Sequence, residues 1–247
     1  MKYTVIVATY NSVALLERTI LSVLSQSYPA RELIVQDGAS TDGTLDILKK
    51  YDKHINWQSE PDAGLYDAWN KALDRASGDW GIFLGSDDFL INNDVLVKCH
   101  RHIKRLPKEI LFAYGALAMG RNAVADEVDN RPLWEVYKRF CGTMGLPFSG
   151  TFVRLALAQK YKFDPSFKVA GDFDFAARFL THCNVARLPL IVSYVERGGI
   201  SNNRKHDCVR LDERNRVLVE RVMPKAHEFV QGCLESSWEA EPELEPL

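Results

Sequence analysis

Short apolar runs alternate with amphipathic segments through the first half of the chain. The run YTVIVA at 3–8 is short and rich in β-branched residues, which predicts a buried strand. Val13, Leu16, Ile20 and Val23 then recur at steps of three and four residues, the spacing of one helix face. The alternation continues along the chain and predicts further strands at 32–36, 55–59, 80–84 and 110–117.

Amphipathic helices fill the intervals between these strands. Residues 40–51 begin with helix-capping side chains, and residues 64–76 place Leu65 and Trp69 on one face with Asp67 on the other. Strands that alternate with helices at this spacing are typical of α/β proteins with a mainly parallel central sheet and helices on both faces. Ligands of such sheets bind at the carboxyl ends of the strands, so polar groups just after strands are functional candidates.

The second half is less regular. Residues 119–145 show no clear period and end in a mixed aromatic and basic segment. Strand and helix signals resume from Thr151, with a helix predicted at 172–183, a strand at 185–195 and a last helix ending near Met223. Because no segment has the composition of a linker, we expect one domain over residues 1–225.

Composition narrows the possible functions. The 247 residues are 46% hydrophobic and 26% charged with a net charge of -2, which is typical of a globular protein and gives no sign of a nucleic-acid partner. Residues 235–247 hold five Glu and no Lys or Arg, which predicts an acidic, mobile tail. The five scattered cysteines fit free thiols in a reducing compartment, and no apolar run reaches the roughly 18 residues of a membrane helix. These features predict a cytoplasmic protein.

Polar groups follow four successive predicted strands, at Thr9-Tyr10-Asn11, Asp37, Asp62 and Ser86-Asp87-Asp88. One such residue alone is readily explained as a turn or a helix cap, but four strand ends share one edge of the sheet. The adjacent carboxylates of Asp87 and Asp88 repel each other, and Mg²⁺ or Mn²⁺ would compensate for this while leaving coordination positions to phosphate oxygens. The sequence contains neither G-x-G-x-x-G, the phosphate-binding motif of NAD-binding proteins, nor G-x-x-x-x-G-K-[ST], the phosphate loop of ATPases. This argues against NAD and ATPase chemistry.

Three stretches resemble the family 2 glycosyltransferases of the GT-A fold, most of all small bacterial enzymes that build surface polysaccharides. They are TVIVATYNSVALLERTILSVLSQSYPARELIVQDGASTDGTLDIL, SEPDAGLYDAWNKAL and GDWGIFLGSDDFL. The resemblance is dense over about residues 2–98 and thins to isolated motifs from 147 to about 201. It implies transfer of one sugar from a nucleoside-diphosphate sugar, UDP foremost, to a hydroxyl of a glycan or lipid-linked acceptor. Residues 1–118 would bind the donor and 119–225 the acceptor.

The resemblance also implies roles for single residues. Asp88 would be the direct ligand of Mn²⁺ or Mg²⁺, and Asp87 would face the ribose or the donor sugar. The remaining donor contacts would come from residues after the strands: Thr9, Tyr10 and Asn11 along the nucleotide, Asp37 at the uracil or ribose, and Asp62, Asp67, Asn70 and Ser86 around the donor.

A second acidic motif of the family stands at the start of a helix, and FKVAGDFDFAARFL is its counterpart here. Asp172 fits the position of the catalytic base, although Gly171 replaces the usual polar neighbour. Asp174 is the competitor, and a first-turn carboxylate favoured by the helix dipole is its plainer explanation. Asp172 would take the proton of the acceptor hydroxyl in one displacement with inversion at the anomeric carbon.

The acceptor side carries fewer signals. Phe148-Ser149-Gly150 stands where members often have Pro-His-Gln, so acceptor contacts are not carried over. Residues 133–140 form either an ordinary half-buried helix or a surface that rests peripherally on a membrane. The basic stretch 197–216 either closes over the donor or is a solvated loop. A nucleotide-sugar-binding module without catalysis, and a sugar nucleotidyltransferase, are the alternative functions.

Overall fold

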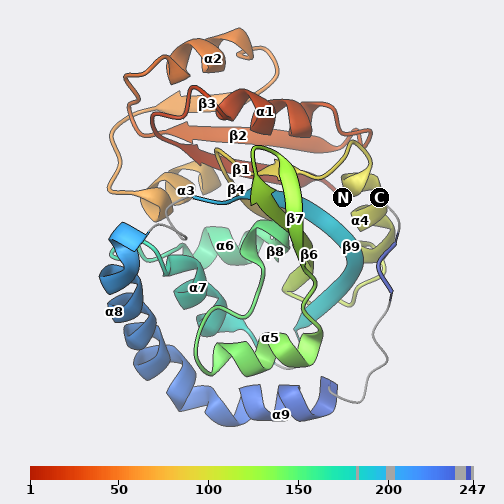
Figure 1. Ribbon diagram of the computed structural model, residues 1–247. Coiled ribbons are helices and arrows are strands. Elements are labelled where there is room, and N and C mark those ends of the chain that lie inside the picture. Colours follow the sequence, from red (N-terminus) through yellow and green to blue (C-terminus); the bar gives the residue numbers. More distant parts are fainter. Residues whose placement is uncertain (182–183, 199–203, 237–242, 246–247) are drawn as a thin grey trace.

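The apolar runs of the sequence form the central strands of one sheet (Figure 1). The computed structural model describes residues 1–181, 184–198, 204–236 and 243–245. Over these residues the sheet has nine strands in the order β3-β2-β1-β4-β8-β6-β9-β5, with β7 paired to β6. The strands are β1 (Tyr3–Thr9), β2 (Arg31–Asp37), β3 (Asn56–Ser59), β4 (Trp80–Gly85), β5 (Phe89–Leu90), β6 (Phe112–Arg121), β7 (Val124–Asp129), β8 (Thr151–Arg154) and β9 (Val185–Glu196).

The sheet is mainly parallel, as the alternating pattern predicts. β1 pairs in parallel with β2 and β4, β2 with β3, and β6 with β9. The short strand β8 lies antiparallel between β4 and β6, so that β6 runs in the same direction as β4. The α/β fold class is therefore confirmed.

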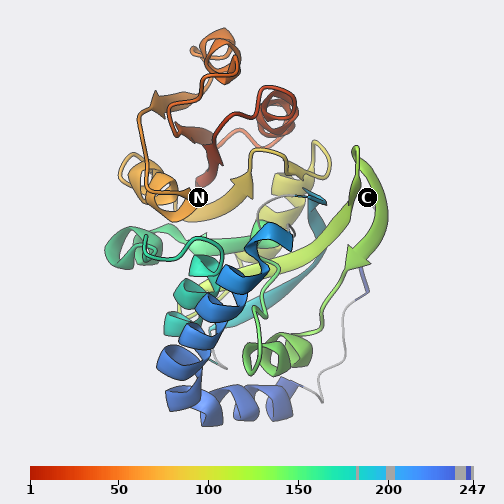
Figure 2. The same cartoon turned by 60° about the vertical axis from the view of Figure 1, so that its left-hand side comes forward.

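Helices cover both faces of the sheet, as Figures 1 and 2 show. The core on one face joins α1, α2 and α4 with Val5, Val7 and Leu84, whereas the core on the other face joins α3, α5, α6 and α7 with Ile6, Ile34 and Phe83. Alternate residues of each central strand thus enter two separate cores, which is why these strands read as unbroken apolar runs. The helices are α1 (Leu16–Leu24), α2 (Thr44–Lys50), α3 (Leu65–Leu73), α4 (Val95–Ile103), α5 (Leu133–Phe140), α6 (Leu155–Tyr161), α7 (Gly171–Phe179), α8 (Asp207–Val217) and α9 (Ala226–Ser236).

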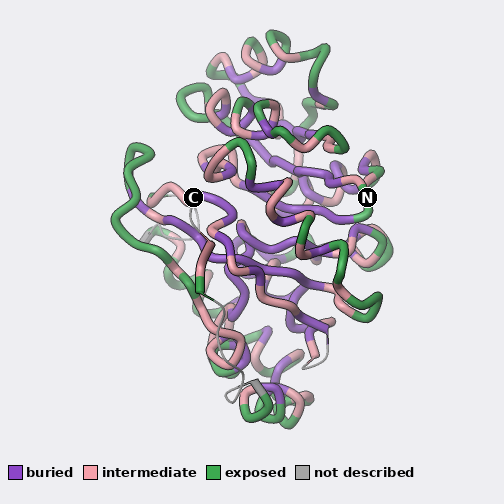
Figure 3. Tube along the Cα trace, turned by 90° about the vertical axis from the view of Figure 1, so that its right-hand side faces the viewer, coloured by how far each residue is buried: buried purple, intermediate pink, exposed green. Residues whose placement is uncertain are grey.

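The second half contains more regular structure than its sequence predicts. β6 extends to Arg121 and forms a hairpin with β7, which lies within the supposedly irregular residues 119–145. β7 is almost wholly exposed (Figure 3), so its sequence lacks the pattern of a buried strand. Residues 133–140 are the half-buried helix α5, with Val136, Tyr137 and Phe140 inside. The chain stays helical past Met223, through α9. Among the described residues, no helix is both long and apolar enough to cross a bilayer.

The acidic tail is described at residues 243–245. There Glu245 lies 2.9 Å from the His102 ring nitrogen Nε2, and its N–H donates to the carbonyl of Pro189. Residues 237–242 and 246–247 of the predicted tail lie outside the described residues, so its mobility stays a prediction.

An aromatic cluster joins the two halves of the chain. The ring of Phe163, which lies between α6 and α7, is 5.1 Å from Phe83 of β4, 5.2 Å from Trp69 of α3 and 4.6 Å from Phe175 of α7. Phe163 is buried, so these contacts exclude water from the junction. They fix α7 against the carboxyl edge of the sheet.

We expect Phe163→Ala to lower the free energy of unfolding by about 3–5 kcal/mol, because it leaves a cavity at this junction. Urea unfolding followed by circular dichroism measures the loss. Val219→Ala is the control: this side chain is 63% exposed, and its truncation should change stability by less than about 0.5 kcal/mol. A Phe163→Ala variant as stable as the control would contradict this role.

Candidate active site

The four strand ends singled out from the sequence lie level at one edge of the sheet. Thr9 at the end of β1 is in register with Asp37 at the end of β2, which is in register with Ser59 at the end of β3. Ala8 of β1 pairs with Gly85, the last residue of β4. The prediction that these polar groups share an edge is confirmed.

A cavity of about 580 Å³ opens at this edge. Five carboxylates line it, those of Asp62, Asp87, Asp88, Asp172 and Glu196. Thr9, Tyr10, Ser86 and Ser149 add polar groups, and Tyr66, Trp69 and Phe148 give it an apolar side. No lysine or arginine is among the described residues that line it, so its ionisable lining is acidic.

Asp88 is the more deeply placed of the two adjacent carboxylates. Its Oδ2 accepts a hydrogen bond from the Ser149 hydroxyl at 3.0 Å, and its Oδ1 accepts one from the N–H of Glu196 at 3.2 Å. Thr19 and Arg18 of α1 hold the turn from behind by donating to backbone carbonyls of Asp88 and Asp87, at 2.6 and 2.7 Å. The turn is thus fixed by neutral donors and one arginine outside the cavity.

Burial makes both carboxylates reluctant to ionise. Desolvation, together with the charge of Asp87, raises the pKa of Asp88 to about 7. Desolvation also raises the pKa of Asp87, and Glu196 adds to this effect. Such oxygen ligands suit a hard divalent cation, whose charge would favour their ionised forms. Among the described residues, no three or more His, Cys, Asp or Glu side chains are grouped so that they could hold a metal ion.

The turns after β1 and β2 are bonded to each other. Asn11 donates its N–H to the Ser40 hydroxyl and accepts with its side chain from the N–H of Thr41. The buried Asp37 accepts from the Ser40 N–H at 2.9 Å and from the Ser59 hydroxyl at 2.6 Å. Asp37 and Asn11 do not line the cavity; they shape the loops beside it, whereas Thr9 and Tyr10 line it.

The candidate residues in α3 and just before it differ in position: one lines the cavity, and the others bond backbone groups of the surrounding structure. Asp62 lines the cavity, and a side chain at Gly38 would place its Cβ 2.6 Å from the Asp62 carboxylate. Asp67 and Asn70 do not line it. The Asp67 carboxylate accepts from the N–H of Ala63, and the Asn70 amide bonds both backbone groups of Phe163.

Asp172 reaches the cavity from the first turn of α7. Burial raises its pKa to about 6, against hydrogen bonds from the Phe173 N–H and the Tyr66 hydroxyl. Asp174 points elsewhere: it is buried and pairs with Arg178 and Arg221, both at 2.9 Å. The geometry therefore agrees with the choice of Asp172 over Asp174 as the candidate base.

Several residues that line the cavity are not predicted from the sequence, and Glu196 and Ser149 are among them. Glu196 directly follows the predicted strand at 185–195, so the expectation that polar groups just after strands are functional would have identified it. Although burial raises the pKa of Glu196, two backbone N–H groups and Arg18 hold it below the usual range. Ser149 carries no signal beyond its place in an altered motif. In the basic stretch, Arg197 pairs with Asp126 and Glu127 of β7, and residues 199–203 lie outside the described residues.

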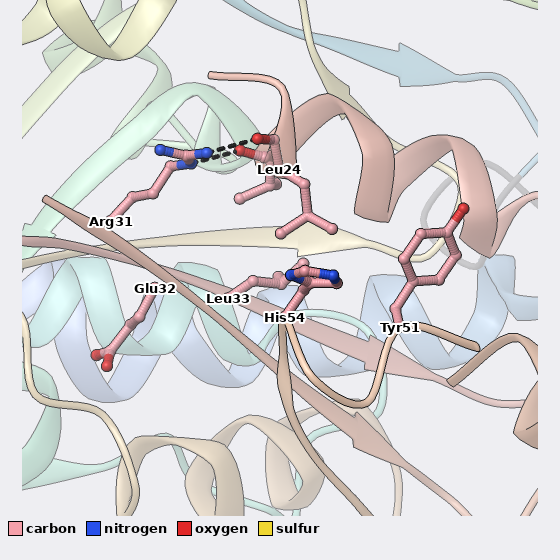
Figure 4. A pocket seen from close by; sticks show the side chains of 7 residues that line it. Leu24, Arg31, Glu32, Leu33, Tyr51 and His54 are labelled. Atoms are coloured by element: carbon pink, nitrogen blue, oxygen red, sulfur yellow. Dashed lines mark hydrogen bonds between the residues drawn. The ribbon is translucent and has the colours of Figure 1, made fainter. Parts of the chain in front are cut away.

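A second hollow lies at the opposite, amino-terminal edge of the sheet (Figure 4). Arg31 there donates to the carbonyls of Val23 and Leu24, which closes the last turn of α1. Among the described residues that line this hollow, Glu32 is the one carboxylate.

Comparison with known proteins identifies relatives over nearly the whole chain. The model of glycosyl transferase family 2 matches residues 4–129. An uncharacterized glycosyltransferase of Mycobacterium tuberculosis is 30% identical over 238 residues, which cover 93% of this chain and 90% of the relative. TuaG of Bacillus subtilis, a glycosyltransferase named for teichuronic acid biosynthesis, is 46% identical over 90 residues, 34% of this chain and 35% of TuaG.

Solved structures share the fold. Residues 1–349 of TarS from S. aureus, in complex with UDP-GlcNAc, superpose with a TM-score of 0.70 at 21% identity, over 96% of this chain and 72% of that one. The mannosyltransferase PcManGT from Pyrobaculum calidifontis, in complex with GDP-Man and Mn²⁺, gives a TM-score of 0.64 at 18% identity, over 98% of this chain and 76% of that one. At these identities the likeness establishes the fold alone.

The raised pKa of Asp88 predicts that this carboxylate destabilises the metal-free protein. The pKa of an aspartate in the unfolded chain is about 3.9, whereas the pKa of Asp88 in the folded protein is about 7. The folded protein therefore loses stability as the pH rises between these two values. We expect Asp88→Asn in EDTA at pH 8 to be more stable than wild type by on the order of 1–3 kcal/mol, with the gain vanishing below about pH 4.

Asp174→Asn is the matched control for this measurement. Its charge is paired with two arginines, so the same change should destabilise the fold by about 3 kcal/mol at pH 8. Urea titrations over this pH range compare the two variants. A loss of stability in Asp88→Asn at pH 8 would show that its carboxylate contributes to folding rather than opposing it.

Proposed function

Because the chain belongs to glycosyl transferase family 2, we propose that it transfers one sugar from a UDP-sugar to a hydroxyl of a glycan or lipid-linked acceptor in bacterial surface polysaccharide synthesis. The observation that carries the proposal is the single cavity in which Asp172 stands together with Asp87 and Asp88. Such a cavity brings a base for the acceptor and oxygen ligands for a metal-bound diphosphate into one space.

The relatives support the donor class and the setting. TarS was solved with UDP-GlcNAc, and TuaG is named for teichuronic acid biosynthesis. The cavity volume of about 580 Å³ lies in the range of small-molecule sites, roughly 300–1,000 Å³. Thr9 and Tyr10 would contact the nucleotide at the first strand end, with Asn11 and Asp37 shaping that end, and Asp62 and Ser86 would lie along the donor.

Asp88 would hold Mn²⁺ or Mg²⁺, and Asp87 would face the ribose or donor sugar. The fit rests on the donor set: both side chains offer hard oxygens, and the described cavity lining contains no cation that would otherwise meet a diphosphate. When bound, the metal ion would stabilise the charge of the departing diphosphate. PcManGT was solved with Mn²⁺, which supports this cofactor class.

Asp172 would act as the general base of an inverting displacement. Its pKa of about 6 keeps it mostly ionised at neutral pH and close enough to neutrality to accept a proton efficiently. It would remove the proton of the acceptor hydroxyl, which attacks the anomeric carbon from the face opposite the nucleotide. Below pH 6 the carboxyl group becomes protonated, so turnover should fall as the pH falls through this value.

A panel of UDP- and GDP-sugars with Mn²⁺, scored for release of nucleoside diphosphate, tests the function. We expect wild type to release UDP from one UDP-sugar, faster with acceptor, and Asp172→Asn to lose turnover by about 10²–10⁴-fold while binding that donor with near wild-type affinity. Asp174→Asn, assayed below its unfolding temperature, is the control, because Asp174 lies outside the cavity.

Each alternative function gives a different outcome in this panel. Donor binding without release would favour a binding module, and pyrophosphate-dependent exchange would favour a nucleotidyltransferase. An Asp172→Asn variant with wild-type turnover would refute the assignment of the base.

A further inference from the structure

The two oxygens of Asp172 have unequal surroundings. Oδ1 accepts the N–H of Phe173 at 2.8 Å and lies 3.3 Å from the hydroxyl of Tyr66. Among the described residues, both hydrogen bonds that other residues donate to this carboxylate go to Oδ1. One oxygen is thus held by the protein, and the other is left to accept a proton.

Tyr66 approaches Asp172 closely because residue 171 is glycine. A Cβ at Gly171 would lie 2.7 Å from the Tyr66 ring, closer than any side chain tolerates. The ring is buried, and its hydroxyl donates to the carbonyl of Val169 at 2.8 Å. The hydroxyl has one proton for two acceptors, Val169 O and Asp172 Oδ1.

Glu213 of α8 fixes the same segment from its other side. Its buried carboxylate accepts the N–H groups of Lys168, Val169 and Ala170 at 2.6, 2.9 and 2.9 Å. Val169 is therefore held at both its N–H, by Glu213, and its carbonyl, by Tyr66. Ala170 is the N-cap residue of α7, so these bonds set where the first turn of the helix begins.

We propose that Tyr66 and Glu213 are positioning residues for the base Asp172. Tyr66 donates to Val169 O while Asp172 is protonated and turns to Oδ1 once Asp172 is ionised, which keeps Oδ2 for the acceptor hydroxyl. Glu213 fixes the backbone at Val169, so that the Val169 carbonyl stays within reach of the Tyr66 hydroxyl in both states. The proposal deepens the proposed function and rests on it.

The pH dependence of turnover reports this contact. Burial raises the pKa of Asp172 most, the Tyr66 hydrogen bond lowers it, and the charge of Glu213 of α8 raises it further. The other ionisable groups that face the same cavity are Asp62, Asp87, Asp88 and Glu196. Removing the Tyr66 hydroxyl removes a donor to the ionised carboxylate. The pKa of the base should then rise, and a purely structural hydroxyl would not have this effect.

The test is the pH profile of kcat/KM of full-length Tyr66→Phe at saturating Mn²⁺. We expect its acidic limb to move upward by about half a pH unit or more, kcat to fall about tenfold, and the KM for the donor to stay within about twofold. Tyr137→Phe is the matched control, since this buried tyrosine donates to the carbonyl of Thr181 away from the cavity. Its acidic limb should coincide with that of wild type.

Gly171→Ala tests the same contact without touching the hydroxyl. It displaces the Tyr66 ring, so it should shift the limb in the same direction, and its effect should not add to that of Tyr66→Phe. Glu213→Gln should lower kcat with unchanged donor KM, because its amide loses one acceptor for the three N–H groups. A wild-type limb in both Tyr66→Phe and Gly171→Ala would overturn the proposal. If Asp172→Asn is inactive in the same assay, Asp172 remains the base of the proposed function even when the positioning roles of Tyr66 and Glu213 are refuted.

Discussion

Desolvation of like charges is the constraint on which the site depends. Five carboxylates face one cavity, and among the described lining residues none is a lysine or arginine. Burial raises the pKa of Asp62, Asp87, Asp88 and Asp172. Buried carboxylates of this kind oppose folding when they ionise, and a bound divalent ion would offset this cost.

The fold supplies the rigidity that this arrangement needs. Level strand ends bring Thr9, Asp37 and Gly85 to one edge, and donors from outside the cavity, Arg18 and Thr19, hold the turn of Asp87 and Asp88. The aromatic cluster around Phe163 then fixes α7, and with it Asp172, across from that edge. Asp87, Asp88 and Asp172 are thus positioned by apolar contacts and hydrogen bonds, whereas Glu196 forms an ion pair with Arg18.

The sequence predicts the residues at the strand ends better than the rest of this site. Asp62, Asp87 and Asp88 follow regular strands, so their position at the edge can be derived from the alternation alone. Tyr66 could not be predicted, because it lies on the apolar face of α3 and resembles any core residue. Glu213 could not be predicted either, since an acidic residue in a charged helix usually faces solvent. Asp67 and Asn70 show the converse: they stand beside the site in sequence, but their side chains bond backbone groups of the scaffold.

The dependence of donor binding on a divalent cation tests this account most directly. Calorimetric titration of UDP into the wild-type protein at neutral pH, first in EDTA and then with excess Mn²⁺, measures it. The account predicts no detectable binding in EDTA and clear binding with Mn²⁺, because the five carboxylates repel a diphosphate until the ion is present. Equal affinity for UDP in both titrations would contradict it.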